Sequence, residues 1–179
     1  MYHAENAALR FVNSIEDDGK TRDINAFRDM AGLLRLVGDP ALSQARAVPL
    51  AELLSFREAL FAVLSSIASG KSPDPSYDAA VRAAIAASLA RANLSLSSDG
   101  LRLGPGPSST QTDVLALSAY ALLTSEDVPR LSECHRCTRL FIDRGRGKGR
   151  RWCDMARCGN RSKAESFRAR KRAAGDSVR

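Results

Sequence analysis

All four cysteines of the 179-residue chain lie in one short stretch near its C-terminal end. Cys134, Cys137, Cys153 and Cys158 follow the pattern C-x2-C-x15-C-x4-C. The first pair forms a tight knuckle that can direct two sulfurs at one ion, and the second pair can complete a tetrahedral shell. This spacing is close to that of structural zinc sites, although the second pair is wider than usual. We therefore expect the four thiolates to hold one structural Zn2+ ion.

Other uses of these residues are open from the sequence. Four cysteines could form two disulfides or two unrelated buried pairs, but we expect an intracellular chain, in which thiols stay reduced. His135 could replace one cysteine as a ligand. A shell of four thiolates is closed, so it predicts a metal that folds the segment and takes no part in catalysis.

The cysteine-containing segment is also the most basic part of the chain. Residues 130–179 carry 16 Lys and Arg against 5 Asp and Glu, a net charge of +11. Residues 1–129 carry 11 against 15, a net charge of −4. Such asymmetry indicates a basic module that meets a polyanion, and double-stranded DNA is the partner we expect. A membrane surface is disfavoured because the segment has few apolar residues to insert.

The basic residues fall into two groups that we predict to contact DNA phosphates. One group surrounds a Gly-rich tip between the cysteine pairs, and the other lies along a predicted helix that Asn160 would cap. The candidates are Arg144, Arg146, Lys148, Arg150 and Arg151 at the tip, and Arg161, Lys163, Arg168, Arg170 and Lys171 on the helix. A solvated charged face is the alternative interpretation.

An enzymatic function, such as that of a nuclease, is disfavoured. Asp143, Asp154 and Glu165 lie near the basic residues, but their spacing does not indicate a metal-binding set. The chain also has no G-x-S-x-G, no phosphate-binding glycine loop and no H-E-x-x-H. We therefore predict no catalytic residues and a protein that is not an enzyme.

Apolar periodicity predicts a mainly helical body over residues 1–129. We expect helices at 24–37, 49–69, 75–91 and 111–124, with residues 4–15 as a helix that runs into a short strand. Between the last two helices, leucines alternate with polar residues on both sides of Asp99-Gly100, which predicts a β-hairpin. The expected fold class is α+β, with a small hairpin or sheet in the body.

Residues 130–179 are expected to form a second, smaller domain. The fifteen residues between the cysteine pairs predict a hairpin in which 138–143 rises, 144–149 turns and 150–152 returns. Leu140 and Ile142 would flank Phe141 in alternation, and Trp152 would pack on the knuckle. A knuckle, a hairpin and a C-terminal helix together resemble a treble-clef zinc finger.

Asn13 is a polar residue within an apolar run, F-V-N-S at 11–14. Its side chain could line a pocket for a small-molecule effector, so Asn13 is the candidate ligand-binding residue of the body. The interpretation we favour is that its amide caps or bridges backbone groups. The body could also form a homodimer.

The segment R-R-W-C-D-M-A-R-C-G-N-R-S-K resembles the CGNR zinc finger, whose tetrad is formed here by residues 158–161. The body, with F-V-N-S at 11–14 and L-L-T-S-E-D at 122–127, resembles the ABATE domain that usually precedes this finger. These resemblances imply a bacterial transcription regulator with an α/β N-terminal domain, a zinc ion on the four cysteines and a DNA-binding finger. The R-G-R-G-K-G tip departs from the family pattern and implies a more basic, more flexible turn.

The chain contains no run of about 20 apolar residues that would span a membrane. Its first ten residues lack an apolar run of signal-peptide length. We therefore expect a cytoplasmic protein. The alternative function is an RNA-binding or scaffold zinc module without operator specificity.

Overall fold

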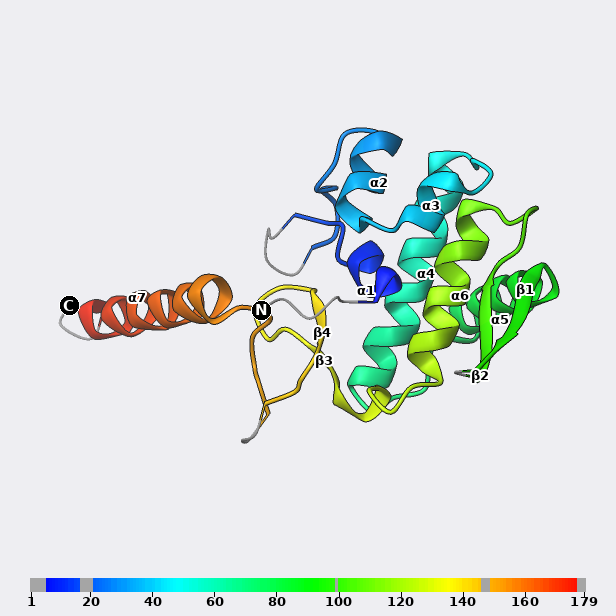
Figure 1. Cartoon of the computed structure of the whole chain (residues 1–179). Helices are drawn as coiled ribbons and strands as arrows, with labels where there is room; N and C mark the ends of the chain where they lie inside the picture. The colour runs from blue at the N-terminus through cyan, green and yellow to red at the C-terminus, as the bar shows by residue number, and fades with distance from the viewer. Residues whose placement is uncertain (1–5, 17–20, 99, 146–148, 177–179) are drawn as a thin grey trace.

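The computed structural model describes residues 6–16, 21–98, 100–145 and 149–176 (Figure 1). Two long helices, α4 (Leu50–Ala68) and α6 (Gln111–Leu123), form the centre of the body. Helices α1 (Ala7–Val12) and α5 (Pro75–Ala90) pack against both of them. Helices α2 (Met30–Val37) and α3 (Pro40–Gln44) lie at one end of this bundle. None of the helices within these ranges is both long and apolar enough to cross a bilayer.

The strands form two separate antiparallel pairs. Strand β1 (Ala92–Ser97) pairs with β2 (Gly100–Pro105) beside the body, and β3 (Leu131–Glu133) pairs with β4 (Leu140–Ile142) after a 3-10 turn, η1 (Val128–Arg130). A π-helical turn, η2 (Met155–Gly159), leads into α7 (Asn160–Asp176). The chain is therefore α+β and mainly helical, with small sheets and a C-terminal helix after the cysteines.

The core of the body is built from the apolar faces that the periodicity predicts. Leu53, Leu60 and Leu64 of α4 are fully buried against Phe11 of α1 and Leu115 of α6. Helix α6 begins with a capping box, in which the Thr110 side chain accepts from the Asp113 N–H and the Asp113 carboxylate accepts from the Thr110 N–H. Arg91 at the end of α5 also binds this carboxylate, which ties the two helices together.

Three details of the first forty residues differ from the prediction. Helix α2 begins at Met30, because its cap is Asp29, whose carboxylate accepts from the Gly32 N–H at 2.7 Å. The residues before it bend back so that Asn25 forms a β-bridge with Ile15. A short additional helix, α3, follows a second cap, Asp39. Local hydrogen-bonding side chains decided these boundaries.

Helix α7 has a different setting from every other helix. It extends away from the body (Figure 1), and residues 163–172 are all exposed. Its nearest neighbour among the described elements is η2, from which it continues. The β1–β2 hairpin lies at the opposite end of the molecule.

Candidate metal centre and nucleic-acid interface

The fold brings all four cysteine sulfurs into one cluster, within 4.8 Å of one another. Three of the sulfur–sulfur distances are 3.6 Å, 3.6 Å and 3.7 Å, for Cys137–Cys153, Cys153–Cys158 and Cys158–Cys137. A disulfide would need about 2.05 Å. A tetrahedral ion with metal–sulfur bonds of about 2.3 Å would hold the sulfurs about 3.8 Å apart. The geometry therefore fits a zinc ion and excludes two disulfides.

The pKa values of the cysteine thiols are also consistent with a bound cation. The hydrogen bond with Cys137, together with burial, raises the pKa of the Cys153 thiol above its ordinary range. Burial raises the pKa of Cys158 to about 12, whereas the hydrogen bond with Cys153 lowers the pKa of Cys137 to about 5. Without a cation the cluster therefore resists full ionisation, and a divalent ion is what would stabilise four thiolates in so small a space. The ion would crosslink the knuckle to the start of the helix and leave no open position for a substrate.

The knuckle that carries the first two cysteines is the turn of the β3–β4 hairpin. The Cys134 N–H donates to the Arg139 carbonyl at 2.9 Å and closes the turn. The sequence-based prediction placed the hairpin after the knuckle, with residues 150–152 as its second strand, and that placement was wrong. The partner strand lies before the knuckle, over residues 131–133, and 150–152 are not in a strand.

The other two cysteines are placed by η2 and its cap. The Asp154 carboxylate accepts from the Arg157 N–H at 2.8 Å and so begins the turn immediately after Cys153. Asn160, which we expected to be the cap, has helical φ and ψ of −67° and −41° and lies inside the continuous helical segment. His135 does not join the sulfur cluster; its backbone N–H donates to the Arg151 carbonyl at 2.9 Å.

The two faces of strand β4 pack against different parts of the molecule. Leu140 is buried in the core of the body and Ile142 packs against that core, while Phe141 lies in the cysteine cluster with Trp152 against it. This confirms the predicted alternation around Phe141 and the packing of Trp152. Because successive side chains of a strand point to opposite faces, one short strand serves the body and the metal centre at once.

Asn13 fastens this strand to the body. Its side-chain NH2 donates to the Leu140 carbonyl at 2.8 Å, and its side-chain oxygen accepts from the Leu140 N–H at 2.9 Å. The residue is 8% exposed. The amide therefore bridges backbone groups, and Asn13 is not among the residues that line the pocket described below.

Further contacts reach the knuckle from the body. Arg22 pairs with Glu58 at 2.6 Å, lies over the Phe61 ring and donates to the Thr138 hydroxyl at 3.4 Å. Burial alone would raise the pKa of Glu58, but the hydrogen bonds and charges of Arg22 and Arg57 lower it below its ordinary value. The knuckle is therefore held by an ionised network as well as by apolar packing.

The predicted DNA-contacting residues at the tip are mostly engaged with the protein. Arg144 pairs with Asp127 at 2.6 Å. Arg150 donates to the carbonyls of Trp152 and Cys153 and lies over the Phe141 ring, 4.8 Å from its centroid. Arg151 lies over the Trp152 ring. Arg146 and Lys148 lie outside the described residues. Arg150 and Arg151 therefore pack on aromatic side chains beside the cysteine cluster, whereas Arg144 ties the finger to Asp127.

The acids near the finger also have structural partners. Asp143 accepts from the N–H groups of Arg150 and Gly145, and these two hydrogen bonds lower the pKa of its carboxyl. Asp154 caps η2, and Glu165 pairs with Arg136 at 3.1 Å. Within the described ranges, the four cysteines are the one group of potential ligands close enough to share an ion.

The predicted helical candidates lie on α7. Lys163, Arg168, Arg170 and Lys171 are exposed and have no ion pair or hydrogen bond with another side chain that the structure describes. Arg161 lies in the first turn of α7, immediately after the metal centre. The Arg136–Glu165 pair joins the knuckle to the helix. This fixes which side of α7 is turned toward the finger.

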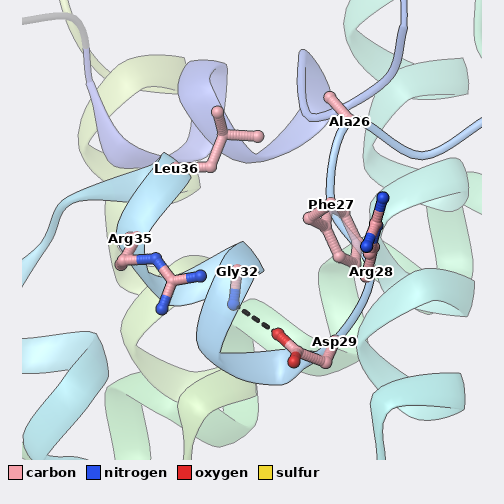
Figure 2. A pocket seen from close by; sticks show the side chains of 7 residues that line it. All are labelled: Ala26, Phe27, Arg28, Asp29, Gly32, Arg35 and Leu36. Carbon is pink, nitrogen blue, oxygen red and sulfur yellow. Dashed lines mark hydrogen bonds between the residues drawn. The ribbon is translucent and has the colours of Figure 1, made fainter.

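The body also has an open pocket of about 500 Å³ beside α2 (Figure 2). Arg28 and Arg35 supply its positive charge, and Phe27 and Leu36 supply apolar surface. The Asp29 carboxylate at its rim is bound to the Gly32 N–H. Sequence periodicity could not reveal this pocket, because its lining comes from the bend before α2 as well as from the helix.

Comparison with protein families gave two matches, in the order expected. A model described as "Putative stress-induced transcription regulator", ABATE, matches residues 5–126, and the CGNR zinc finger matches residues 130–171. These are regulator and zinc-finger families rather than enzyme families. Among curated proteins, no sequence matched the chain. The first match covers well over half of the chain, so this protein belongs to the ABATE family and carries a C-terminal CGNR zinc finger built on Cys134, Cys137, Cys153 and Cys158.

Proposed function

We propose that this protein is a transcription regulator of the bacterial cytoplasm that binds double-stranded DNA through its CGNR finger. The observation that supports this most strongly is the exposure of the basic side chains Lys163, Arg168, Arg170 and Lys171 on α7, a helix that stands clear of the body (Figure 1). In this proposal, zinc positions the helix and the helix contacts the DNA.

The basic residues of α7 occupy one broad side of the helix. At 100° per residue, the six basic positions from 161 to 172 span an arc of about 200°. The remaining arc carries Ser162, Glu165, Ser166 and Ala169, and Glu165 turns it toward the knuckle through Arg136. An α-helix fits the major groove of B-DNA, where its basic side chains can reach the phosphates on either side.

Charge removal from α7 tests this assignment. We expect Lys163→Gln, Arg168→Gln and Arg170→Gln together to weaken binding of the zinc-loaded chain to a selected DNA duplex. The slope of log Kd against log salt should fall by about 3, because each lost phosphate contact lowers it by about 1. Fluorescence anisotropy across a salt series measures both quantities.

The matched control removes three positive charges from exposed positions of the body, with Arg46→Gln, Lys71→Gln and Arg82→Gln. An equal change in both variants would mean that net charge alone drives binding. Tighter binding to structured RNA, with no preference among DNA sequences, would replace the regulator with an RNA-binding zinc module.

We further propose that the body receives a small anionic effector at the α2 pocket, where two guanidinium groups lie beside apolar surface (Figure 2). Two contacts link the pocket to the finger through α1. Arg10 of α1 donates to the Val37 carbonyl at the end of α2. Asn13, the residue after α1, binds the backbone of Leu140 in the finger. Benzoate, as a probe, should shift NMR signals of α2 residues in the wild type and not in Arg35→Gln. Equal shifts with neutral benzamide would contradict an anion site.

A further inference from the structure

The β1–β2 hairpin presents four exposed leucines. Leu94, Leu96, Leu101 and Leu103 are 62%, 84%, 65% and 38% exposed, respectively. Their alternation predicts a sheet with one buried face, yet no described part of the chain covers that face. Monomeric soluble proteins rarely leave a contiguous apolar patch uncovered unless it is an interaction site.

The strand register joins these leucines into a single surface. Leu94 lies opposite Leu103, and Leu96 lies opposite Leu101. Residues two apart on a strand point to the same side, so the four side chains form one apolar face. Arg102 pairs with Ser95 and therefore points to the other side of the hairpin. Among the described residues of the two strands, none on the leucine face is charged.

We propose that this face is the contact between two copies of the chain. A two-fold axis brings the same residues of each copy together, so a surface without charge meets its own image without repulsion. The finger cannot serve in this way, because two segments with a net charge of +11 repel each other. The hairpin lies at the end of the molecule opposite α7, so pairing there leaves both α7 helices free (Figure 1).

The size of the face sets the strength of the contact. The four exposed fractions amount to about two and a half fully exposed leucines per copy. Stable complexes usually bury about 800 Å² on each partner, which is considerably more than these side chains offer. We therefore expect the dimer to be weak and reversible.

Sedimentation velocity of the zinc-loaded full chain, from about 1 μM to 300 μM, tests the proposal. The wild type should shift from monomer to dimer over this range, and Leu96→Ser with Leu101→Ser should raise the dissociation constant at least tenfold. The matched control, Leu36→Ser with Phe167→Ser, replaces two exposed apolar side chains elsewhere and should leave dimerisation unchanged. This test does not depend on DNA binding.

A charge exchange gives a result that misfolding cannot imitate. Leu96→Lys with Leu101→Lys, and Leu96→Glu with Leu101→Glu, should each remain monomeric, because like charges then face each other across the axis. An equimolar mixture of the two variants should form a heterodimer. A wild type that stays monomeric at 300 μM would overturn the proposal and leave the face to a different protein, as would a dimer that neither exchange disturbs.

Discussion

Asn13 shows how a single side chain can join two parts of a chain that are far apart in sequence. Its side-chain amide forms two hydrogen bonds with the backbone of Leu140, one as donor and one as acceptor, and both residues are buried. The amide satisfies one N–H and one C=O that would otherwise be unpaired. The apolar run around Asn13 indicates that this residue has a special role, but the sequence cannot name a partner 127 positions away.

We expect Asn13→Ala to lower the free energy of unfolding by about 2–3 kcal/mol, because two buried backbone groups of Leu140 lose their partner. Asn13→Asp should also destabilise the protein, since a carboxylate cannot donate to the carbonyl. Urea denaturation of the zinc-loaded chain measures both effects, with Asn93→Ala, at an exposed position, as the control. Unchanged stability of Asn13→Ala, together with loss of an effector response, would instead assign the residue to ligand binding.

At the scale of elements, the long periodic helices are the part that the sequence predicts well. The limits of α4, α5 and α6 lie within one or two residues of the prediction, because each has an apolar face and a clear Pro, Gly or Thr signal at an end. The β1–β2 hairpin also lies where alternation and Asp99-Gly100 predict it, although Asp99 itself lies outside the described residues.

The finger hairpin was placed wrongly for a physical reason. Strands β3 and β4 have three residues each, which is too short for a periodic signal. Their pairing is set by the knuckle turn and by burial of Leu131 and Leu140 in the core of the body. The four metal ligands were predictable because all four cysteines lie in one short segment whose spacing is close to that of structural zinc sites. The pairing of Arg144 with Asp127 and the packing of Arg150 on Phe141 depend on tertiary contacts and were not predicted.

At the scale of the whole molecule, the finger and the body are not independent units. Leu131 and Leu140 belong to the core of the body, and Asn13 binds the backbone of Leu140. Ser65 of α4 also donates to Glu133 of β3 at 2.5 Å. A change that loosens β4 therefore reaches both the metal centre and the helices.

We expect Cys153→Ser to lower the zinc content from one ion per chain and also to lower the melting temperature of the body by about 5–10 °C, as the shared strand loses its order on one face. Elemental analysis measures the zinc content, and the helical circular dichroism signal, followed as the temperature rises, measures the melting temperature. His135→Asn should retain one zinc ion and the wild-type melting temperature. Retained zinc in Cys153→Ser would contradict the ligand assignment, and an unchanged body melt would mean that the strand folds without the metal.

The exposed position of α7 has a thermal consequence. Helix α7 has 17 residues, is exposed over residues 163–172 and is held to the finger by η2 and by the Arg136–Glu165 pair, so it depends largely on its own helical propensity and on what it binds. The helicity of a helix with little tertiary packing falls as the temperature rises. The body, with its buried core, should outlast α7 on heating. The protein would then release a polyanion bound to this helix while the rest of the chain remained folded. Its affinity for that polyanion would therefore fall as the temperature rises.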